Sequence, residues 1–141
     1  MNKVYVMVGL PGSGKSTVAK TLDGTLISTD SIREELYGDE NIQGDGRIVF
    51  SIAFCRAREA LERGENVIFD ATNVSRKARK GVLKATPGAE HVAVFVNTPF
   101  EECVRRNRNR TRVVPDEVLE RMHKSLVPPT VEEGFAEVIE K

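Results

Sequence analysis

Short runs of β-branched and apolar residues alternate along the chain with longer segments whose apolar residues recur at helical spacing. The short runs predict strands at residues 3–8, 25–29, 66–69, 91–96 and 135–139. Helical spacing and helix-end residues predict helices over 15–22, 30–36, 47–63, 75–85, 98–107 and from 115 to just before Pro128. Strands separated by helices form a parallel sheet covered on both faces, with right-handed crossovers. The predicted fold class is therefore a three-layer α/β/α architecture with a parallel sheet.

Two of these helices have clear start signals. Asp30 is a residue type that caps helices, and it opens the helix over residues 30–36. The segment Thr98-Pro99-Phe100-Glu101 supplies a capping residue, a proline at the first helical position and an acid three residues after the cap. We therefore expect Asp30 and Thr98 to act as helix caps.

The most specific motif lies between the first predicted strand and the first predicted helix. It is the phosphate loop, which reads Gly9-Leu10-Pro11-Gly12-Ser13-Gly14-Lys15-Ser16-Thr17. Its glycines let successive backbone N–H groups point into one concavity, to which the helix N-terminus adds positive charge. Lys15 can then reach the β- and γ-phosphates, and the Ser16 hydroxyl can ligate Mg²⁺. The motif, in its strand and helix context, predicts a nucleotide site of the P-loop NTPase and kinase kind, with a plain glycine-rich turn as the alternative.

The second predicted strand ends at an acid that precedes an arginine by three residues. Asp30 and Arg33 would lie on one face of the helix and together grip one substrate. A kinase needs a carboxylate that orients the acceptor hydroxyl and takes its proton, and Asp30 is the candidate. The spacing is equally consistent with Asp30 as a helix cap and Arg33 as a surface cation.

The third predicted strand carries an acid at its tip, in the segment Val67-Ile68-Phe69-Asp70-Ala71-Thr72-Asn73. This placement is typical of the Mg²⁺-associated aspartate of phosphate-loop proteins. Asp70 can hold the metal through water or orient Arg33 or Asp30, and the sequence does not separate these roles. A strand-end turn without a chemical role is the simpler alternative.

Five arginines occur within eight positions near the end of the 98–107 helix. They are Arg105, Arg106, Arg108, Arg110 and Arg112. Such a cluster suits an arginine-rich lid, at about residues 105–114, that closes on the transferring phosphate and stabilises its charge. The alternative is a solvated basic face neutralised by Glu101, Glu102 and Glu117.

Other charged and aromatic residues permit two interpretations each. The four basic residues Arg76, Lys77, Arg79 and Lys80 suit either a nucleic-acid backbone or water. Phe50 and Phe54, one helical turn apart, suit either a base-stacking platform or core packing, and core packing is favoured.

Length and composition limit the protein class. With 141 residues the chain is of single-domain size, so residues 1–141 are expected to form one domain. Lys plus Arg and Asp plus Glu each number 21, so a polyanion would have to bind a local patch. The two cysteines lack metal-ligand spacing, so no zinc site is expected. The sequence shows no apolar run of membrane-spanning length and no leader pattern, which predicts a cytoplasmic protein without a membrane partner.

Four segments together resemble the 5′-hydroxyl polynucleotide kinases, and the likeness runs almost from end to end. These segments are the phosphate loop, Asp30-Ser31-Ile32-Arg33, Asp70-Ala71-Thr72-Asn73, and Arg106-Asn107 through Arg110 to Val114-Pro115. The resemblance implies that Lys15 and Ser16 bind the ATP phosphates and Mg²⁺. It further implies that Asp30 activates the 5′-hydroxyl and Arg33 holds the acceptor's phosphate. Arg110, with Arg106 as a second candidate, would reach the transferring phosphate.

The leading hypothesis is an ATP- and Mg²⁺-dependent kinase that phosphorylates the 5′-hydroxyl end of DNA or RNA. A kinase of a small metabolite or nucleoside is an alternative, because one fold serves many acceptors. A nucleotide-binding regulatory switch is an alternative of another class. The chain has no Asn-Lys-x-Asp segment of the guanine-reading type, and a switch does not need an acid-arginine pair at a second strand end.

Overall fold

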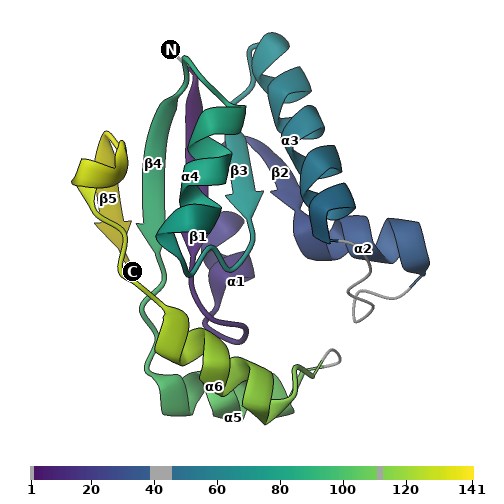
Figure 1. Cartoon of the computed structure of the whole chain (residues 1–141), viewed down its shortest axis with the longest axis vertical. Helices are drawn as coiled ribbons and strands as arrows, with labels where there is room; N and C mark the ends of the chain where they lie inside the picture. Colours follow the sequence, from purple (N-terminus) through teal and green to yellow (C-terminus); the bar gives the residue numbers. More distant parts are fainter. Residues whose placement is uncertain (1, 39–45, 111–112) are drawn as a thin grey trace.

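The computed structural model describes residues 2–38, 46–110 and 113–141. Five strands and six α-helices alternate along these residues (Figure 1). The strands are β1 Lys3–Val8, β2 Thr25–Ser28, β3 Val67–Asp70, β4 Glu90–Phe95 and β5 Glu137–Glu140. The helices are α1 Lys15–Ala19, α2 Thr29–Tyr37, α3 Gly46–Glu62, α4 Arg76–Ala85, α5 Phe100–Arg108 and α6 Asp116–Ser125, with a short 3₁₀ helix, η1, at Val131–Glu133. The alternation predicted from the sequence is therefore confirmed.

The sheet is parallel throughout, in the order β2-β3-β1-β4-β5. β1 is the central strand, and Tyr5 is in register with Ile68 of β3 and with Val92 of β4. Every strand therefore ends at the same edge. The segments that follow β1, β2 and β3 meet there, which is where ligands bind in open parallel sheets.

Apolar side chains cover the two faces of the sheet unequally. On one face, sheet residues such as Val6 and Phe69 pack in one cluster with Ile32 of α2, Val49 of α3 and Val82 of α4. On the other face, a smaller cluster combines residues such as Met7, Ile68 and Val94 with Ala19 of the five-residue α1. The three layers are as predicted. The fully buried residues pack closely, which holds the strand ends in fixed positions.

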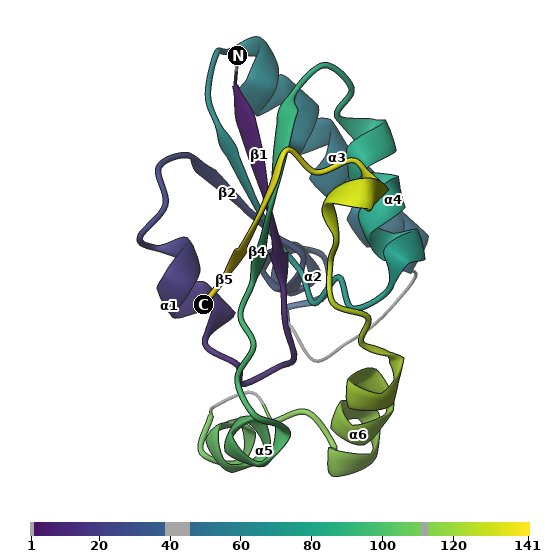
Figure 2. The ribbon, with the colours of Figure 1, turned by 90° about the vertical axis from the view of Figure 1, so that its left-hand side faces the viewer.

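Helices α5 and α6 lie beyond the carboxyl edge of the sheet, beside each other (Figure 2). They have an apolar cluster of their own, centred on Leu10, Cys103 and Leu119. Phe100 of α5 also stacks on His123 of α6, with the ring centres 4.4 Å apart. The predicted lid region spans the end of α5 and the connection to α6, and its Arg112 lies outside the described residues. In the three described ranges, no helix has both the length and the apolar character required to cross a bilayer.

The two predicted caps differ from the observed ones. Ser28 precedes α2 and its hydroxyl accepts a hydrogen bond from the amide of Ser31, so Ser28 is the cap and Asp30 is the second residue of the helix. The predicted cap Thr98 instead donates its hydroxyl to the carbonyl of Ser13 at 2.6 Å, and Pro99 precedes α5 without a side-chain cap. Both side chains therefore contact residues at the carboxyl edge of the sheet, Arg33 for Asp30 and Ser13 for Thr98, and neither caps a helix.

Arg79 is a buried structural residue, so the nucleic-acid interpretation is wrong for this position. Its side chain is fully buried and makes a two-pronged ion pair with Glu133 of η1, at 2.8 and 3.0 Å. It also donates to the carbonyls of Asn73 and Val74. One guanidinium thereby ties the segment that follows β3 to Glu133, which lies 54 positions after Arg79 in sequence.

We predict that Glu133→Gln destabilises the protein by about 3–5 kcal/mol, because it leaves the buried Arg79 charge without its counter-ion. Denaturant unfolding at neutral pH measures this change. The matched control is Glu132→Gln, an exposed neighbour, for which we expect a change within about 0.5 kcal/mol. Equal stability of the two variants would contradict the structural role of the pair.

Candidate active site

A cavity of about 710 Å³ opens at the carboxyl edge of the sheet, between the strand ends and α6. Its wall combines the phosphate loop, the first residues of α2, the tip of β3 and the start of α6. Its lining includes Lys15, Ser16, Asp30, Arg33, Phe50, Asp70, Thr72, Arg110, Arg121 and Met122. Residues predicted from three separate strand ends and from the arginine-rich segment therefore share one cavity.

The backbone of the phosphate loop is held against two neighbouring segments. Gly12 and Gly14 have φ angles of +82° and +96°, which favour glycine. A Cβ atom on Gly12 would lie 2.6 Å from the carbonyl oxygen of Cys103, so α5 packs directly on the loop. On the other side, the amide of Gly9 donates to the carbonyl of Thr72 at 3.0 Å. Side chains at these glycines would prevent the loop from closing into a cradle.

Ser13 and Arg106 mark the α5 side of this cradle. The Ser13 hydroxyl is buried and has no hydrogen-bond partner in the described structure, as expected of a polar atom placed for an anion. Arg106 donates to the Ser13 carbonyl at 3.3 Å and pairs with Glu102 at 2.9 Å. The guanidinium therefore lies beside the loop, and its Nη1 is 3.3 Å from the position of a Cβ on Gly14.

Lys15 places an ammonium group inside the cavity, where it donates to the carbonyl of Leu10 at 3.2 Å. Desolvation lowers the pKa of Lys15 from its ordinary value of 10.5. The carboxylates of Asp70 and Asp30 act in the opposite direction, and Arg110 reinforces the lowering. The cavity is thus built around a cation whose charge two acids support, which is a suitable setting for a polyphosphate.

Asp70 interacts with both Lys15 and Ser16. Desolvation raises its pKa above 3.8, and the neighbouring Asp30 raises it further; Lys15 and a hydrogen bond with the Ser16 side chain lower it. Ser16 and Asp70 thus present two oxygen donors at one point of the cavity. This pair fits Mg²⁺, which is usually held by one or two protein oxygens together with phosphates and water. Among the described residues no cluster of three or more acidic, histidine or cysteine side chains suggests another metal centre.

Asp30 and Arg33 form the acid-arginine pair expected from their spacing, with a 3.0 Å contact between Oδ1 and Nη1. Their exposures differ, at 41% for the Asp30 side chain and 13% for Arg33. The Arg33 Nε is buried and makes no hydrogen bond in the described structure. Arg33 therefore holds the carboxylate at the cavity wall while the carboxylate stays accessible. The capping role of Asp30 is excluded, and Arg33 is not a surface cation.

The arginine-rich segment divides into two groups. Arg105 pairs with Glu102, and Arg108 pairs with Asp116 on the outer surface, so the solvated-face interpretation holds for both. Arg110 instead lines the cavity and donates to the side-chain oxygen of Asn107 at 3.1 Å. Only Arg106 and Arg110, among the described members of the cluster, lie at the phosphate loop or the cavity.

Sequence reasoning missed two asparagines that shape the cavity wall. Asn107 is fully buried; it donates to the carbonyl of Val114 and accepts from the Val114 amide, which ties the end of α5 to the residues that precede α6. Asn73 has a φ of 47° and donates to the carbonyl of Met7 at 2.8 Å, which holds the segment after β3 against β1. A polar residue tolerant of left-handed geometry directly after a strand was the available signal for Asn73.

The two phenylalanines of α3 pack against the core, and Phe50 also faces the cavity. The rings of Phe50 and Phe54 lie 5.8 Å apart, and each approaches the buried ring of Phe69. Core packing is confirmed for both residues. Phe50 additionally supplies an apolar surface to the cavity that Asp30 and Arg33 also line.

We predict that Asp70→Asn lowers the pKa of Lys15 further, because it removes the carboxylate with the larger supporting effect on the ammonium group. Asp30→Asn should act in the same direction to a smaller extent. The measurement is a ¹³Cε chemical-shift titration of Lys15 in the ligand-free protein. Asp23→Asn, in the exposed turn after α1, is the control and should leave the titration unchanged. A Lys15 pKa unaffected by Asp70→Asn would show that the two groups do not interact.

Comparisons with known proteins place the chain in a family. A family model described as an AAA domain, AAA_33, matches residues 4–129. An L-seryl-tRNA(Sec) kinase of Methanococcus maripaludis is 27% identical over 143 residues, covering 89% of this chain and 53% of that protein. A bifunctional polynucleotide phosphatase/kinase of Schizosaccharomyces pombe is 28% identical over 145 residues, covering 98% of this chain and 33% of that protein.

Solved structures share the fold. A chain in the structure of the Pnkp1/Rnl/Hen1 RNA repair complex superposes with a TM-score of 0.78 and 24% identity, over 89% of this chain and 44% of that one. The chain spans about half the length of the first relative and a third of the second. It belongs to the AAA_33 family and has the α/β fold of the P-loop kinases.

Proposed function

We propose that this P-loop kinase transfers the γ-phosphoryl group of ATP to the 5′-hydroxyl of a DNA or RNA end. One observation carries the proposal. The accessible carboxylate of Asp30, held by Arg33, lines the same cavity as Lys15 of the phosphate loop. A kinase requires this arrangement of an acceptor base across from a phosphate cradle.

In this reaction Asp30 accepts the proton of the acceptor hydroxyl. The acceptor oxygen forms a bond to the γ-phosphorus while the bond from that phosphorus to the β–γ bridging oxygen breaks, so ADP leaves with the bonding electron pair. Arg33 would hold the phosphate that follows the reacting nucleotide while it orients Asp30. The products are ADP and a 5′-phosphorylated end.

The phosphate loop and the remaining side chains would bind the phosphates of ATP and Mg²⁺. The backbone of the phosphate loop, which includes Pro11 and Thr17, would surround the phosphates. Lys15, Arg110 and Arg106 would stabilise the negative charge on the transferring group. Ser16 and Asp70 would hold Mg²⁺, which screens the phosphate charges when bound. The end of α5 and the residues after it, where Asn107 positions Arg110, would serve as the arginine-rich lid.

A nucleic-acid acceptor is supported by the cavity and by the relatives. An apolar ring, Phe50, in the same cavity as the Asp30–Arg33 pair suits a nucleoside that carries a phosphate. The Schizosaccharomyces pombe relative is named for action on polynucleotides, and the Methanococcus maripaludis relative for action on L-seryl-tRNA. We therefore favour a polynucleotide end over a small metabolite as the acceptor.

We predict that Asp30→Asn lowers the rate of phosphoryl transfer about 10²- to 10⁴-fold, because the acceptor hydroxyl loses its base. ATP affinity should change little. Transfer of labelled phosphate to a 5′-hydroxyl oligonucleotide gives the rate, and equilibrium binding gives the affinity. Glu34→Gln, an exposed position on the same helix, is the matched control and should retain full activity.

The acceptor class is tested in the same assay with a panel of nucleosides, sugars and small alcohols. Label that appears only on small molecules would overturn the polynucleotide proposal while leaving a kinase in place. An Asp30→Asn variant with an unchanged ATPase rate, in a protein that phosphorylates none of these acceptors, would indicate a regulatory switch instead.

A further inference from the structure

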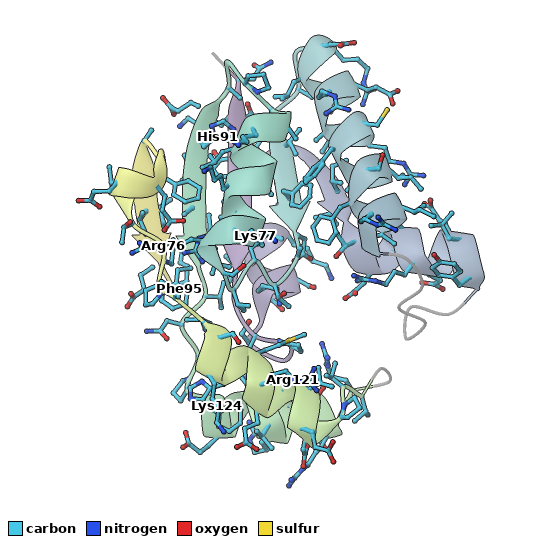
Figure 3. All side chains as sticks on the ribbon, in the orientation of Figure 1. Arg76, Lys77, His91, Phe95, Arg121 and Lys124 are labelled. Atoms are coloured by element: carbon cyan, nitrogen blue, oxygen red, sulfur yellow. The ribbon has the colours of Figure 1, made fainter. Side chains whose placement is uncertain are left out.

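The end of α6 meets the beginning of α4 next to the cavity. The amide of Val127, which follows α6, donates to the carbonyl of Val74, which precedes α4, at 2.9 Å. Basic residues lie on both sides of this junction and on the same side of the molecule (Figure 3). We call this the α4–α6 surface, and its members are Arg76 and Lys77 of α4 and Arg121 and Lys124 of α6.

The positive charge of this surface is only partly compensated. Two exposed arginines elsewhere have acidic partners, Arg56 with Glu35 and Arg63 with Glu65. Within the described residues, Lys77 and Arg121 form no ion pair. Among their basic neighbours, Lys124 pairs with Glu120 at 3.3 Å, and Arg76 interacts with Glu133, whose carboxylate is already bound by Arg79.

Local stability does not account for this arrangement of charges. The first turn of α4 contains no acidic residue, and the cations there oppose the helix dipole. The net charge of the whole chain is zero, so this local excess of positive charge is not a general property of the protein. It therefore indicates a binding patch.

The α4–α6 surface is continuous with the cavity. Arg121 lines the cavity, as does the neighbouring Met122. Thr72, two residues before Val74, lines it from the other side of the junction. A chain of phosphates that starts at Arg33 and leaves the cavity past Arg121 would next meet Lys77 and Lys124.

We propose that the α4–α6 surface is the path by which the polynucleotide leaves the cavity, with backbone phosphates of the second and following nucleotides against Arg121 and Lys77. This inference rests on the proposed function and extends it. A small metabolite would end inside the cavity and leave these cations unused, whereas a strand has a repeating negative charge that reaches them. The acceptor is therefore a strand of several nucleotides.

The test compares two acceptors, a nucleoside 3′-monophosphate and a 5′-hydroxyl single-stranded 12-mer. For Lys77→Gln we expect kcat/KM on the 12-mer to fall about threefold to tenfold at low salt, and its salt dependence to weaken by about 0.7 in log-log slope. The value for the monophosphate should not change, because Lys77 lies beyond the first nucleotide. Arg121→Gln should affect the 12-mer more strongly, with a smaller loss on the monophosphate, because Arg121 also lines the cavity.

The matched control is Lys84→Gln, an exposed lysine in the last turn of α4, away from the junction. It should behave as wild type with both acceptors, and thermal melting shows whether each variant is folded. Equal losses on both acceptors, or no loss for Lys77→Gln on the 12-mer, would overturn the path while leaving the polynucleotide kinase intact. A wild-type protein that phosphorylates neither acceptor would overturn the proposed function together with the path.

Discussion

Desolvation of the Lys15 ammonium group is the constraint around which the cavity is organised. A charge removed from water costs several kcal/mol unless opposite charges accompany it. Asp70 from the tip of β3 and Asp30 from the start of α2 provide that support, while Arg110 opposes it. The acids remain beside the lysine because their strands are adjacent members of one parallel sheet. The site therefore holds positive and negative side chains close together before any ligand binds. A polyphosphate would bring further negative charge to these cations.

The phosphate loop is prepared for binding by contacts with three other parts of the chain. Gly9 is bound to the segment after β3, Gly12 packs on the backbone of α5, and Thr98 holds the carbonyl of Ser13. A loop ordered during folding loses little further conformational entropy when it binds a ligand. Its donors also need little reorganisation as charge develops on a transferring phosphate. The shape of the phosphate loop thus depends both on the glycine spacing in the sequence and on the packing of α5 against the loop.

The two walls of the cavity are connected through hydrogen bonds between segments distant in sequence. Arg79 binds the segment after β3 to η1, and the Val127–Val74 hydrogen bond joins that same segment to the end of α6. Asn107 fixes the connection that carries Arg110. Displacement of α6 would therefore be felt at the tip of β3, where Asp70 lies. These contacts hold Arg110 in place relative to the strand ends.

Local sequence patterns determined the order of strands and helices, the phosphate loop and the candidate residues at the strand ends. These features depend on spacing between neighbours in the chain, as with Asp30 and Arg33, which share a face because three residues separate them. Tertiary structure decided the pairings across long stretches of sequence. The sequence grouped Arg79 with three other basic residues, whereas in the structure Arg79 pairs with Glu133, 54 positions away. Thr98 read as a helix cap because its helix signal is local, whereas the Ser13 carbonyl that it binds lies 85 positions away. Only the packing of segments distant in sequence brings such partners within hydrogen-bond reach, and that packing also separated the arginines of the cavity from those that remain in solvent.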